Sequence, residues 1–297
     1  MLPSPSVRLH IAVIVLIALT ACTRSETKPI VVGSKNFTES VLLGEIAAQE
    51  LESNGCKVDR RLNMGGSLVC DSAITSGSLD VYVEYSGTAL TAILKQPIAS
   101  DRAAVDRIVT TAYAIRGLTW GPALGFNNTF AMIVRQSDAA KYALRSISDL
   151  GKVSSTFRPG FGYEFAERPD GWNGLLRAYG LKFSSSPQTM DLGLTYKALA
   201  SGEIDLIAGN STDGLIESLG LVALTDDRHY FPPYDAAIVS RSGIATKCSG
   251  ARSALDSLRG SIDDTAMRRL NYEVDGKKRD VAEVAREFLQ KKLNKAQ

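Results

Sequence analysis

Histidine is nearly absent from this chain, and so are the short motifs of several enzyme classes. Of its 297 residues only His10 and His229 are histidines, so histidine ligands cannot cluster around a metal ion. The sequence has no GxxxxGKS/T loop, no HExxH, no GxGxxG after a predicted strand and no GxSxG. We therefore expect no enzymatic activity, no metal and no cofactor.

An excess of charge of one sign is also missing. The 34 basic and 32 acidic residues give a formal net charge of +2, and the basic residues are spread along the chain, with a run of three at 277–279 and a pair at 291–292 near the C-terminus. Nucleic acid is therefore not expected as a partner. Hydrophobic residues make up 44% and charged residues 22%, as in soluble globular proteins, so neither disorder nor a coiled coil is expected. The length is roughly twice the 150 residues of a usual domain and predicts two lobes.

The longest apolar run lies near the N-terminus and is too short to span a bilayer. Residues 11–19 would form a helix ~14 Å long, against ~30 Å of hydrocarbon. A Leu-Thr-Ala-Cys sequence that ends at Cys22 follows, and it resembles the processing box of bacterial lipoproteins. We expect a lipoprotein signal peptide over 1–21, acylation of Cys22, and a polar tether over 22–29. An ordinary secretory leader is the alternative, and both predict export.

Cysteine is scarce, which limits both disulfides and metal sites. Apart from Cys22 the chain has Cys56, Cys70 and Cys248, an odd number that leaves at least one without an intrachain partner. Export permits a disulfide, but the sequence does not reveal the pairing, and buried free thiols are the alternative. No CxxC spacing occurs, so we expect no zinc site.

Strands and helices are predicted to alternate along the chain. Short β-branched or apolar runs predict strands at 30–32, 57–62, 79–83, 152–157, 203–208 and 236–239. Helical spacing of apolar residues predicts helices at 41–51, 68–74, 101–116, 172–179, 191–201, 251–258, 263–274 and 281–293. Ser34 or Asn36 is expected to cap the first helix, and Ser67 the second. The alternation indicates βαβ units and a mostly parallel sheet.

The apolar stretches at 120–134 and 231–240 are predicted to cross between the two lobes. The first lobe would then comprise 30–127 and 236–297, and the second lobe 128–235. The expected fold class is α/β, with two doubly wound lobes joined by two crossings. Ligands of open α/β sheets bind at the carboxyl ends of the strands, so we expect a cleft at the crossings and hinge closure around a ligand.

Four segments of the sequence resemble one known family. They are GSKNFTE at 33–39, LDVYVEYSGT at 79–88, ERPDG at 167–171 and DDRHYFPPY at 226–234. The same segments, in the same order, are found in the substrate-binding lipoproteins of quaternary-amine, or osmoprotectant, ABC importers. The resemblance implies a two-lobed periplasmic-binding-protein-like fold of type II. It also implies a protein that captures glycine betaine, choline, carnitine or proline betaine between its lobes.

The resemblance also implies partners and a location. The ligand would be handed to the membrane subunits of an ABC permease, which work with an ATPase. We expect a monomer, in the periplasm or at the cell surface, attached to the membrane through the lipid on Cys22. A pair of lobes that senses its ligand without transporting it is the alternative function.

The chemistry of a trimethylammonium group explains which residues matter. It has no proton to donate, so aromatic faces hold it best, each desolvated contact contributing about 2 kcal/mol. By motif position the resemblance places such faces at Tyr85, Tyr234 and Phe130, the last where the family usually has tyrosine. Asn210 stands where a fourth tyrosine is usual, which would weaken binding of a quaternary ammonium by ~1–2 kcal/mol. A different small amine or polar solute is therefore the alternative ligand.

Polar positions complete the predicted site. Lys35, Thr88 and Arg168 match family positions near the polar end of the ligand, where a carboxylate prefers basic side chains and hydrogen-bond donors. Asn128 stands where the family often has aspartate.

Five of the eight predicted site residues also have a purely structural alternative. The tyrosines would simply pack with one wet edge, Lys35 would be a solvated residue before a helix, and Arg168 would stabilise a surface turn. Asn210 would be a hinge residue. His229 is expected in an exposed loop.

Overall fold

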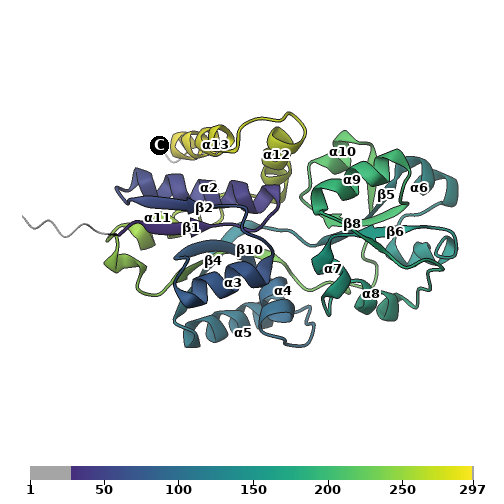
Figure 1. Cartoon of the computed structure of the whole chain (residues 1–297), viewed down its shortest axis with the longest axis horizontal. Helices are drawn as coiled ribbons and strands as arrows, with labels where there is room; N and C mark the ends of the chain where they lie inside the picture. Colours follow the sequence, from purple (N-terminus) through teal and green to yellow (C-terminus); the bar gives the residue numbers. More distant parts are fainter. Residues whose placement is uncertain (1–27, 296–297) are drawn as a thin grey trace, which may run out of the picture.

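The computed structural model of the protein describes residues 28–295. The predicted signal peptide, Cys22 and most of the tether lie outside the described residues. The described chain forms two five-stranded sheets with strand orders β2-β1-β3-β10-β4 and β7-β6-β8-β5-β9. Helices cover both faces of each sheet (Figure 1). We call the part built on the former sheet the first lobe and the part built on the latter the second lobe.

The first sheet is mixed, so the prediction of a mostly parallel sheet is wrong. Its strands are β1 (Ile30–Gly33), β2 (Val58–Arg61), β3 (Val81–Tyr85), β4 (Leu118–Asn127) and β10 (Asp235–Arg241). β1 pairs in parallel with β2 and β3, whereas β10 pairs antiparallel with β3 and β4. The reason is that β4 leads out toward the second lobe and β10 returns from it. The two adjacent strands therefore run in opposite directions.

The second sheet has the same mixture of pairings. Its strands are β5 (Phe130–Arg135), β6 (Pro159–Phe161), β7 (Gln188–Thr189), β8 (Leu206–Asn210) and β9 (Leu221–Leu224). β6 pairs in parallel with β7 and β8, and β5 pairs antiparallel with β8 and β9.

The predicted strand at 152–157 is wrong. Ser146 and Asp149 form a capping box that starts a 3₁₀ helix over Ile147–Lys152. The turn then continues, because the N–H of Phe157 bonds the carbonyl of Val153 at 2.9 Å. The strand therefore begins only at Pro159.

Helices of the first lobe lie on both sides of its sheet. They are α2 (Thr38–Ser53), α3 (Ser67–Ser76), α4 (Ser86–Thr88), α5 (Arg102–Ile115), α11 (Ala251–Asp256), α12 (Asp264–Asp275) and α13 (Val281–Lys295), with a π-helical turn at Ala89–Ile93 and a 3₁₀ turn at Ile244–Thr246. α2 and α13 cover one face and α3 and α5 the other (Figure 1). None of the helices within the described range is both long and apolar enough to cross a membrane.

The predicted helix caps are wrong, although the helices exist. α2 follows Phe37 and has no side-chain cap, and Ser34 instead accepts a hydrogen bond from the N–H of Asn63 at 2.8 Å. Gly66 is the N-cap of α3, and Ser67 is its first helical residue. Contacts with distant segments therefore override the local capping preference.

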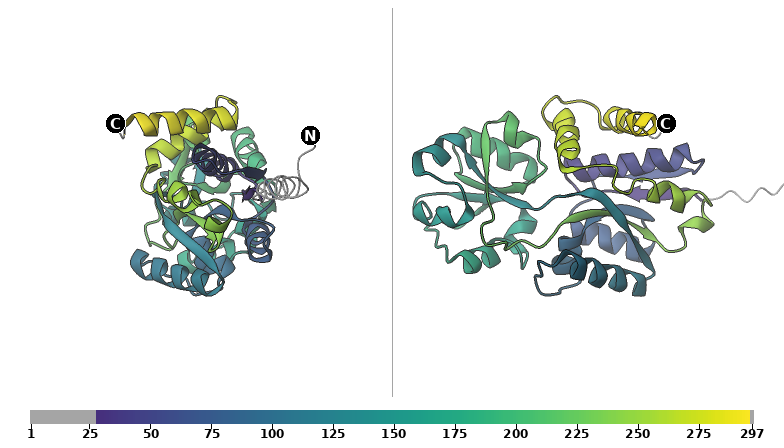
Figure 2. Two further views of the ribbon diagram at one scale, coloured as in Figure 1. Left: turned by 90° about the vertical axis from the view of Figure 1, so that its left-hand side faces the viewer. Right: turned by 180° about the vertical axis from the view of Figure 1, so that it is seen from behind.

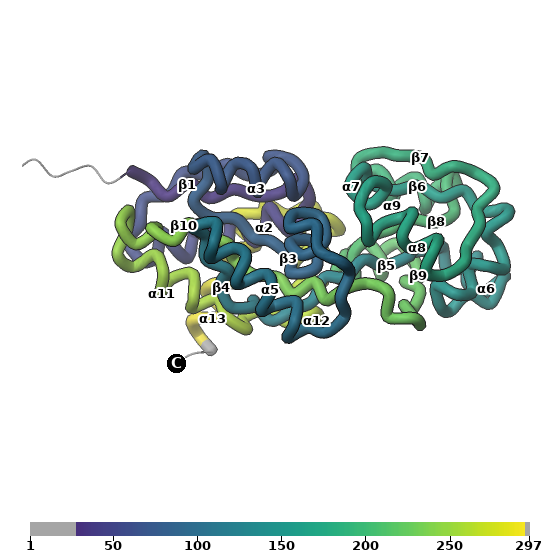
Figure 3. Tube along the Cα trace, turned by 90° about the horizontal axis from the view of Figure 1, so that it is seen from below, coloured from purple at the N-terminus to yellow at the C-terminus, as the bar shows by residue number. Residues whose placement is uncertain are grey.

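The second lobe carries shorter helices. They are α6 (Gln136–Tyr142), α7 (Tyr163–Glu167), α8 (Trp172–Tyr179), α9 (Leu192–Ser201) and α10 (Leu215–Ser218). Viewed from behind, two chain segments run between the lobes, one joining β4 to β5 and one leading into β10 (Figure 2). From below, the end of β3 and the helix α7 lie where the two lobes face each other (Figure 3).

A disulfide joins the N-terminal and C-terminal segments of the chain that together build the first lobe. Cys56, which follows α2, is bonded to Cys248, which precedes α11, across 192 residues of sequence. In the chain-entropy description, a disulfide that closes a loop of this size stabilises the fold by about 5 kcal/mol, because it restricts the unfolded chain. Cys70 is a buried free cysteine on α3, and burial raises the pKa of its thiol to about 12. It is therefore an inert thiol in the folded protein.

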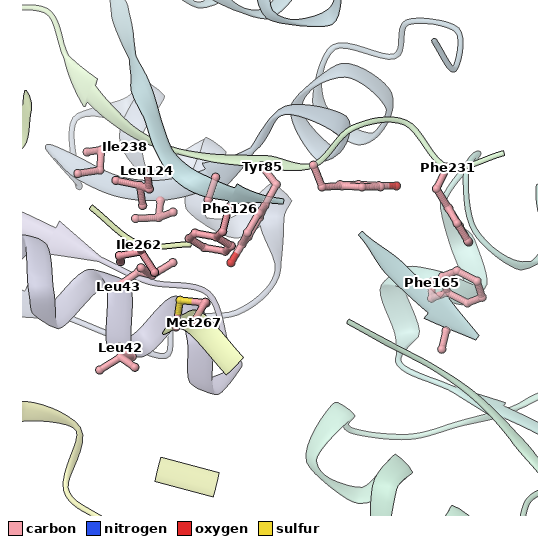
Figure 4. Close-up of a cluster of buried hydrophobic side chains, with 14 of the residues drawn as sticks. Leu42, Leu43, Tyr85, Leu124, Phe126, Phe165, Phe231, Ile238, Ile262 and Met267 are labelled. Carbon is pink, nitrogen blue, oxygen red and sulfur yellow. The ribbon is translucent and has the colours of Figure 1, made fainter. Parts of the chain in front are cut away.

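The hydrophobic core of the first lobe reaches the cleft at a tyrosine. Side chains from α2, β4, β10 and the start of α12 pack together, including Leu42, Leu43, Leu124, Phe126, Ile238, Ile262 and Met267 (Figure 4). Tyr85 lies at the edge of this cluster, on the side that faces Phe165 and Phe231 of the second lobe (Figure 4). The core thereby fixes an aromatic ring at the boundary between the lobes.

Candidate ligand-binding site

A cavity of about 270 Å³ lies between the lobes, at the ends of several strands. All eight residues that the sequence singled out line it, namely Lys35, Tyr85, Thr88, Asn128, Phe130, Arg168, Asn210 and Tyr234. They come from both lobes and from both crossings, and β3, β5 and β8 each contribute a terminal residue. The structure brings these residues together, and their role in binding stays a prediction.

Aromatic rings form one wall of the cavity. The ring of Phe130 packs edge-on against Phe165 at 4.8 Å and against Tyr234 at 5.5 Å between centroids. On the first lobe, Tyr85 is 6.2 Å from Phe37. Sequence reasoning missed Phe37 and Phe165 as cavity residues. Phe37 could have been identified from the sequence, because this residue lies within the GSKNFTE segment.

Lys35 is buried against this aromatic wall, so its interpretation as a solvated residue is wrong. Its Nζ lies 2.5 Å from Oε1 of Glu84, with side chains 3% and 0% exposed, and donates to Oγ of Ser67 at 3.3 Å. The same Nζ lies 4.5 Å from the ring centroid of Tyr85. The Lys35 charge is thus neutralised by Glu84 while it contacts one ring of the wall.

Arg168 is buried as well, which contradicts the surface-turn alternative. Its Nε and Nη2 bond the carboxylate of Asp170 at 2.9 and 2.6 Å, a bidentate pair. Its Nη1 donates to Oγ1 of Thr88 at 2.9 Å, a hydrogen bond between the lobes. Burial acts to raise the pKa of Asp170, but the hydrogen bonds and charge of Arg168 hold it below its usual value. Tyr234 also donates to this carboxylate, and Asp170 therefore stays ionised.

Asn210 ends β8 and lines the cavity, half-buried. Its backbone N–H donates to Oδ2 of Asp213 at 2.8 Å. Its side-chain amide lies 3.4 Å from the same carboxylate, at the long end of hydrogen bonding. The amide is therefore held only loosely, by Asp213.

The sequence predicted none of the carboxylates at the site, and besides Glu84, Asp170 and Asp213 these include Glu164 and Glu39. Glu164 of α7 lines the cavity, and its Oε1 accepts the backbone N–H of Ser67 in the other lobe at 2.6 Å. Glu39, near the start of α2, is 1% exposed and accepts hydrogen bonds from Tyr85 and Asn128, both at 2.7 Å. Glu39 lies within the GSKNFTE segment, whereas nothing in the sequence points to Glu164.

Neither a metal-binding cluster nor a histidine lies at the cavity among the described residues. Within 28–295 no three His, Cys, Asp or Glu side chains are grouped so that they could hold a metal ion. His229 is exposed in a loop with a positive φ of 50°, as predicted.

Comparison with known proteins agrees with this geometry. Residues 28–291 match the family described as the substrate binding domain of ABC-type glycine betaine transport systems. The carnitine transport binding protein OpuCC of Listeria monocytogenes is 34% identical over 264 residues, which cover 88% of this chain and 85% of that protein. A solved structure described as a glycine betaine/carnitine/choline ABC transporter is 32% identical, with a TM-score of 0.73 over 88% of this chain and 98% of that one.

A further relative is larger than this chain. The ergothioneine transport permease/ergothioneine binding protein EgtU of Helicobacter pylori is 36% identical over 267 residues, or 90% of this chain. The chain spans about half of that relative, since the match covers 48% of its length.

Proposed function

The chain belongs to the family of substrate-binding domains of ABC-type glycine betaine transport systems, and from this premise we propose that its cavity captures a quaternary amine and delivers it to a membrane permease. Members of this family bind solutes and are not enzymes. The fold is that of the type II periplasmic binding proteins. The observation that carries the proposal is the gathering of Tyr85, Phe130 and Tyr234 around one cavity between the lobes.

The charges around the cavity suit a cationic head group. The two basic side chains at the wall are each neutralised by a carboxylate, Lys35 by Glu84 and Arg168 by Asp170. A trimethylammonium group would therefore meet aromatic faces without facing an uncompensated positive charge. A desolvated cation–π contact contributes about 2 kcal/mol, so three such faces contribute about 6 kcal/mol, which corresponds to a Kd of roughly 40 μM.

The polar end of a betaine would lie toward Arg168 and Thr88. A guanidinium and a nearby hydroxyl can both donate hydrogen bonds to the oxygens of a carboxylate ligand. We further propose that the protein acts outside the cytoplasm, is attached to the membrane through a lipid on Cys22, and passes its ligand to a permease driven by an ATPase.

Calorimetry with the purified protein tests the proposal. The panel is glycine betaine, choline, carnitine, proline betaine and ergothioneine, with 3,3-dimethylbutanol as a neutral isostere of choline. We expect heat and a thermal upshift with at least one quaternary amine, and at least tenfold weaker binding of the neutral isostere than of choline if choline binds. Absence of heat and of thermal shift with every amine would reject the proposal.

A larger or more polar ligand is a second candidate, favoured by Asn210. An amide in place of a ring loses a cation–π face but offers a hydrogen bond to a polar substituent. Ergothioneine combines a trimethylammonium betaine with a hydrogen-bonding ring, and one relative is named for it. Tighter binding of ergothioneine than of glycine betaine in the same panel would favour this candidate, and the reverse order would reject it.

A further inference from the structure

A buried carboxylate lies behind the cavity wall, outside the lining itself. Glu39 is the second residue of α2 and is 1% exposed. Its partners come from four segments far apart in the sequence, namely Tyr85, Asn128, Thr212 and Asn271. All four are uncharged hydrogen-bond donors. They occupy the four lone-pair sites of the carboxylate and so favour its ionised form. Burial acts in the opposite direction and raises the pKa of Glu39.

The two oxygens of Glu39 bond different parts of the molecule. Oε1 accepts from the Tyr85 hydroxyl and from Nδ2 of Asn128, both at 2.7 Å and both on the cavity wall. Oε2 accepts from the Thr212 hydroxyl at 2.6 Å and from Nδ2 of Asn271 at 2.8 Å. Thr212 belongs to the second lobe, in the loop that follows β8, whereas Asn271 belongs to α12 of the first lobe. One carboxylate therefore bonds the cavity wall and the facing lobe together.

The bond to Glu39 also determines which way the amide of Asn128 points. Because Nδ2 donates to Glu39, Oδ1 is at the opposite end of the amide, and among the described residues it has no hydrogen-bond partner. Asn128 is 6% exposed and lines the cavity. A residue of the cavity wall thus carries a buried acceptor oxygen that no described protein group uses. An acceptor oxygen is attractive to the polarised methyl groups of a quaternary ammonium, and an NH₂ group is not.

We infer that Glu39 is a positioning residue for ligand binding, one that presents Oδ1 of Asn128 and the ring of Tyr85 to the cavity and ties both to Thr212 across the lobes. This inference rests on the proposed function for its ligand. It extends that function by assigning a role to a residue that does not touch the cavity.

The variant Glu39→Gln tests the inference because the two amides that bond Glu39, those of Asn128 and Asn271, are not held equally firmly. Its new NH₂ group must face either Asn128 or Asn271. Asn271 is held by a second bond, from Nδ2 to the carbonyl of Thr212 at 3.0 Å, so reversing its amide would break that bond too. Asn128 has no such second bond and reverses more readily. The reversed amide turns its NH₂ toward the cavity, where it repels a cation.

The expected result is an at least tenfold rise in the Kd of the quaternary amine that binds the wild type. The matched control is Glu45→Gln, another buried carboxylate of α2, bonded to Arg60 and Gln49 away from the cavity. It should leave the Kd unchanged. Adding Asn128→Asp to Glu39→Gln should restore the Kd to within about threefold, because the introduced carboxylate would accept from the new amide and present an oxygen to the cavity. An unchanged Kd in Glu39→Gln, or no rescue, would overturn the inference.

A second measurement needs no ligand and separates this inference from the proposed function. In the ligand-free protein, Glu39→Gln and Thr212→Val should each raise the radius of gyration in small-angle X-ray scattering, because each loosens the bond between the lobes. Glu45→Gln should not. If the wild type binds no amine, the proposed function fails, and the scattering then decides the inference. An unchanged radius in both variants would overturn it.

Discussion

Glu164 of the second lobe accepts a hydrogen bond of 2.6 Å from the backbone N–H of Ser67, the first helical residue of α3 in the first lobe. A carboxylate at this place meets the positive end of the helix dipole as well as an unpaired N–H. The approach is close, since a Cβ added to Gly66 would lie 2.5 Å from the Glu164 carboxylate. The contact joins the lobes beside the cavity.

Removing this carboxylate should weaken ligand binding by loosening closure. For Glu164→Ala we expect a loss of about 1 kcal/mol, roughly fivefold in Kd, expressed mainly as faster release. Stopped-flow dissociation together with calorimetry measures it. The control is Glu167→Ala, an exposed residue of the same helix α7. Equal effects of the two substitutions would contradict a specific role for Glu164.

Restoring an aromatic ring at the fourth position should strengthen binding of a trimethylammonium ligand. For Asn210→Tyr we expect a gain of ~1–2 kcal/mol, tenfold or more in Kd, through one additional cation–π contact. Asn210→Leu fills a similar space without a π face and should give no such gain. Calorimetry with choline and glycine betaine compares the two variants. An equal gain in both would show that volume, and not the ring, is what the site lacks.

Arg168 should distinguish ligands with a carboxylate from those without one. Arg168→Lys keeps the charge but loses the bidentate contact with Asp170 and the bond to Thr88. We expect at least tenfold weaker binding of glycine betaine and a smaller loss for choline. Because Asp170 is buried, the free energy of unfolding should also fall, by about 1–3 kcal/mol. The same loss for both ligands would argue against recognition of the carboxylate.

Asp213 should make the stability depend on pH. Burial raises the pKa of Asp213 to about 6 from 3.8, although hydrogen bonds from Tyr196 and Asn210 oppose the shift. The folded state therefore holds this proton more tightly than the unfolded state. The group stabilises the fold below about pH 4, and this contribution is lost as the pH rises through 6.

Urea unfolding of Asp213→Asn at several pH values measures this dependence. The variant carries an uncharged amide, so its stability relative to the wild type should increase from pH 4 to pH 7 and then level off. A difference that is constant over this range would show that Asp213 does not titrate there.

Reduction of the disulfide should change stability but not affinity. The bond between Cys56 and Cys248 constrains a segment of 192 residues, and neither cysteine lines the cavity. Cys56→Ser/Cys248→Ser should lower the free energy of unfolding by up to about 5 kcal/mol and leave the Kd unchanged. Thermal unfolding and calorimetry of the variant measure both quantities, with Cys70→Ala as the control. A changed Kd would show that the bond supports the site as well as the fold.

The local sequence was sufficient to predict most elements, and the family resemblance predicted part of the cavity lining. Helical spacing identified α5, α8, α9 and α13, because each has an apolar stripe that the core buries. Five of the eight predicted cavity residues lie in the four segments that carry the family resemblance. Asn128, Phe130 and Asn210 were placed by their match to other family positions, and all eight line one cavity.

What the sequence did not reveal depends on contacts between distant segments. The bond between Glu39 and Asn271 joins residues 232 positions apart, and that between Glu164 and Ser67 joins residues 97 apart. The spacing of apolar residues along the sequence does not indicate such distant pairs. The antiparallel pairing of β10 likewise depends on the route of the chain through the second lobe. The strand expected at 152–157 is a different failure, because the capping box of Ser146 and Asp149 is local and was overlooked.

The interleaved route of the chain has a consequence for how the protein matures. All strands of the second sheet lie between Phe130 and Leu224, so this lobe can assemble before about the last quarter of the chain is available. The first lobe must wait for β10 and the helices after it. The bond between Cys56 and Cys248 can therefore form only after both ends of the chain have met. Thiol labelling of newly made chains over time would measure the fraction in which this disulfide has formed. That fraction reports how many chains have completed the first lobe.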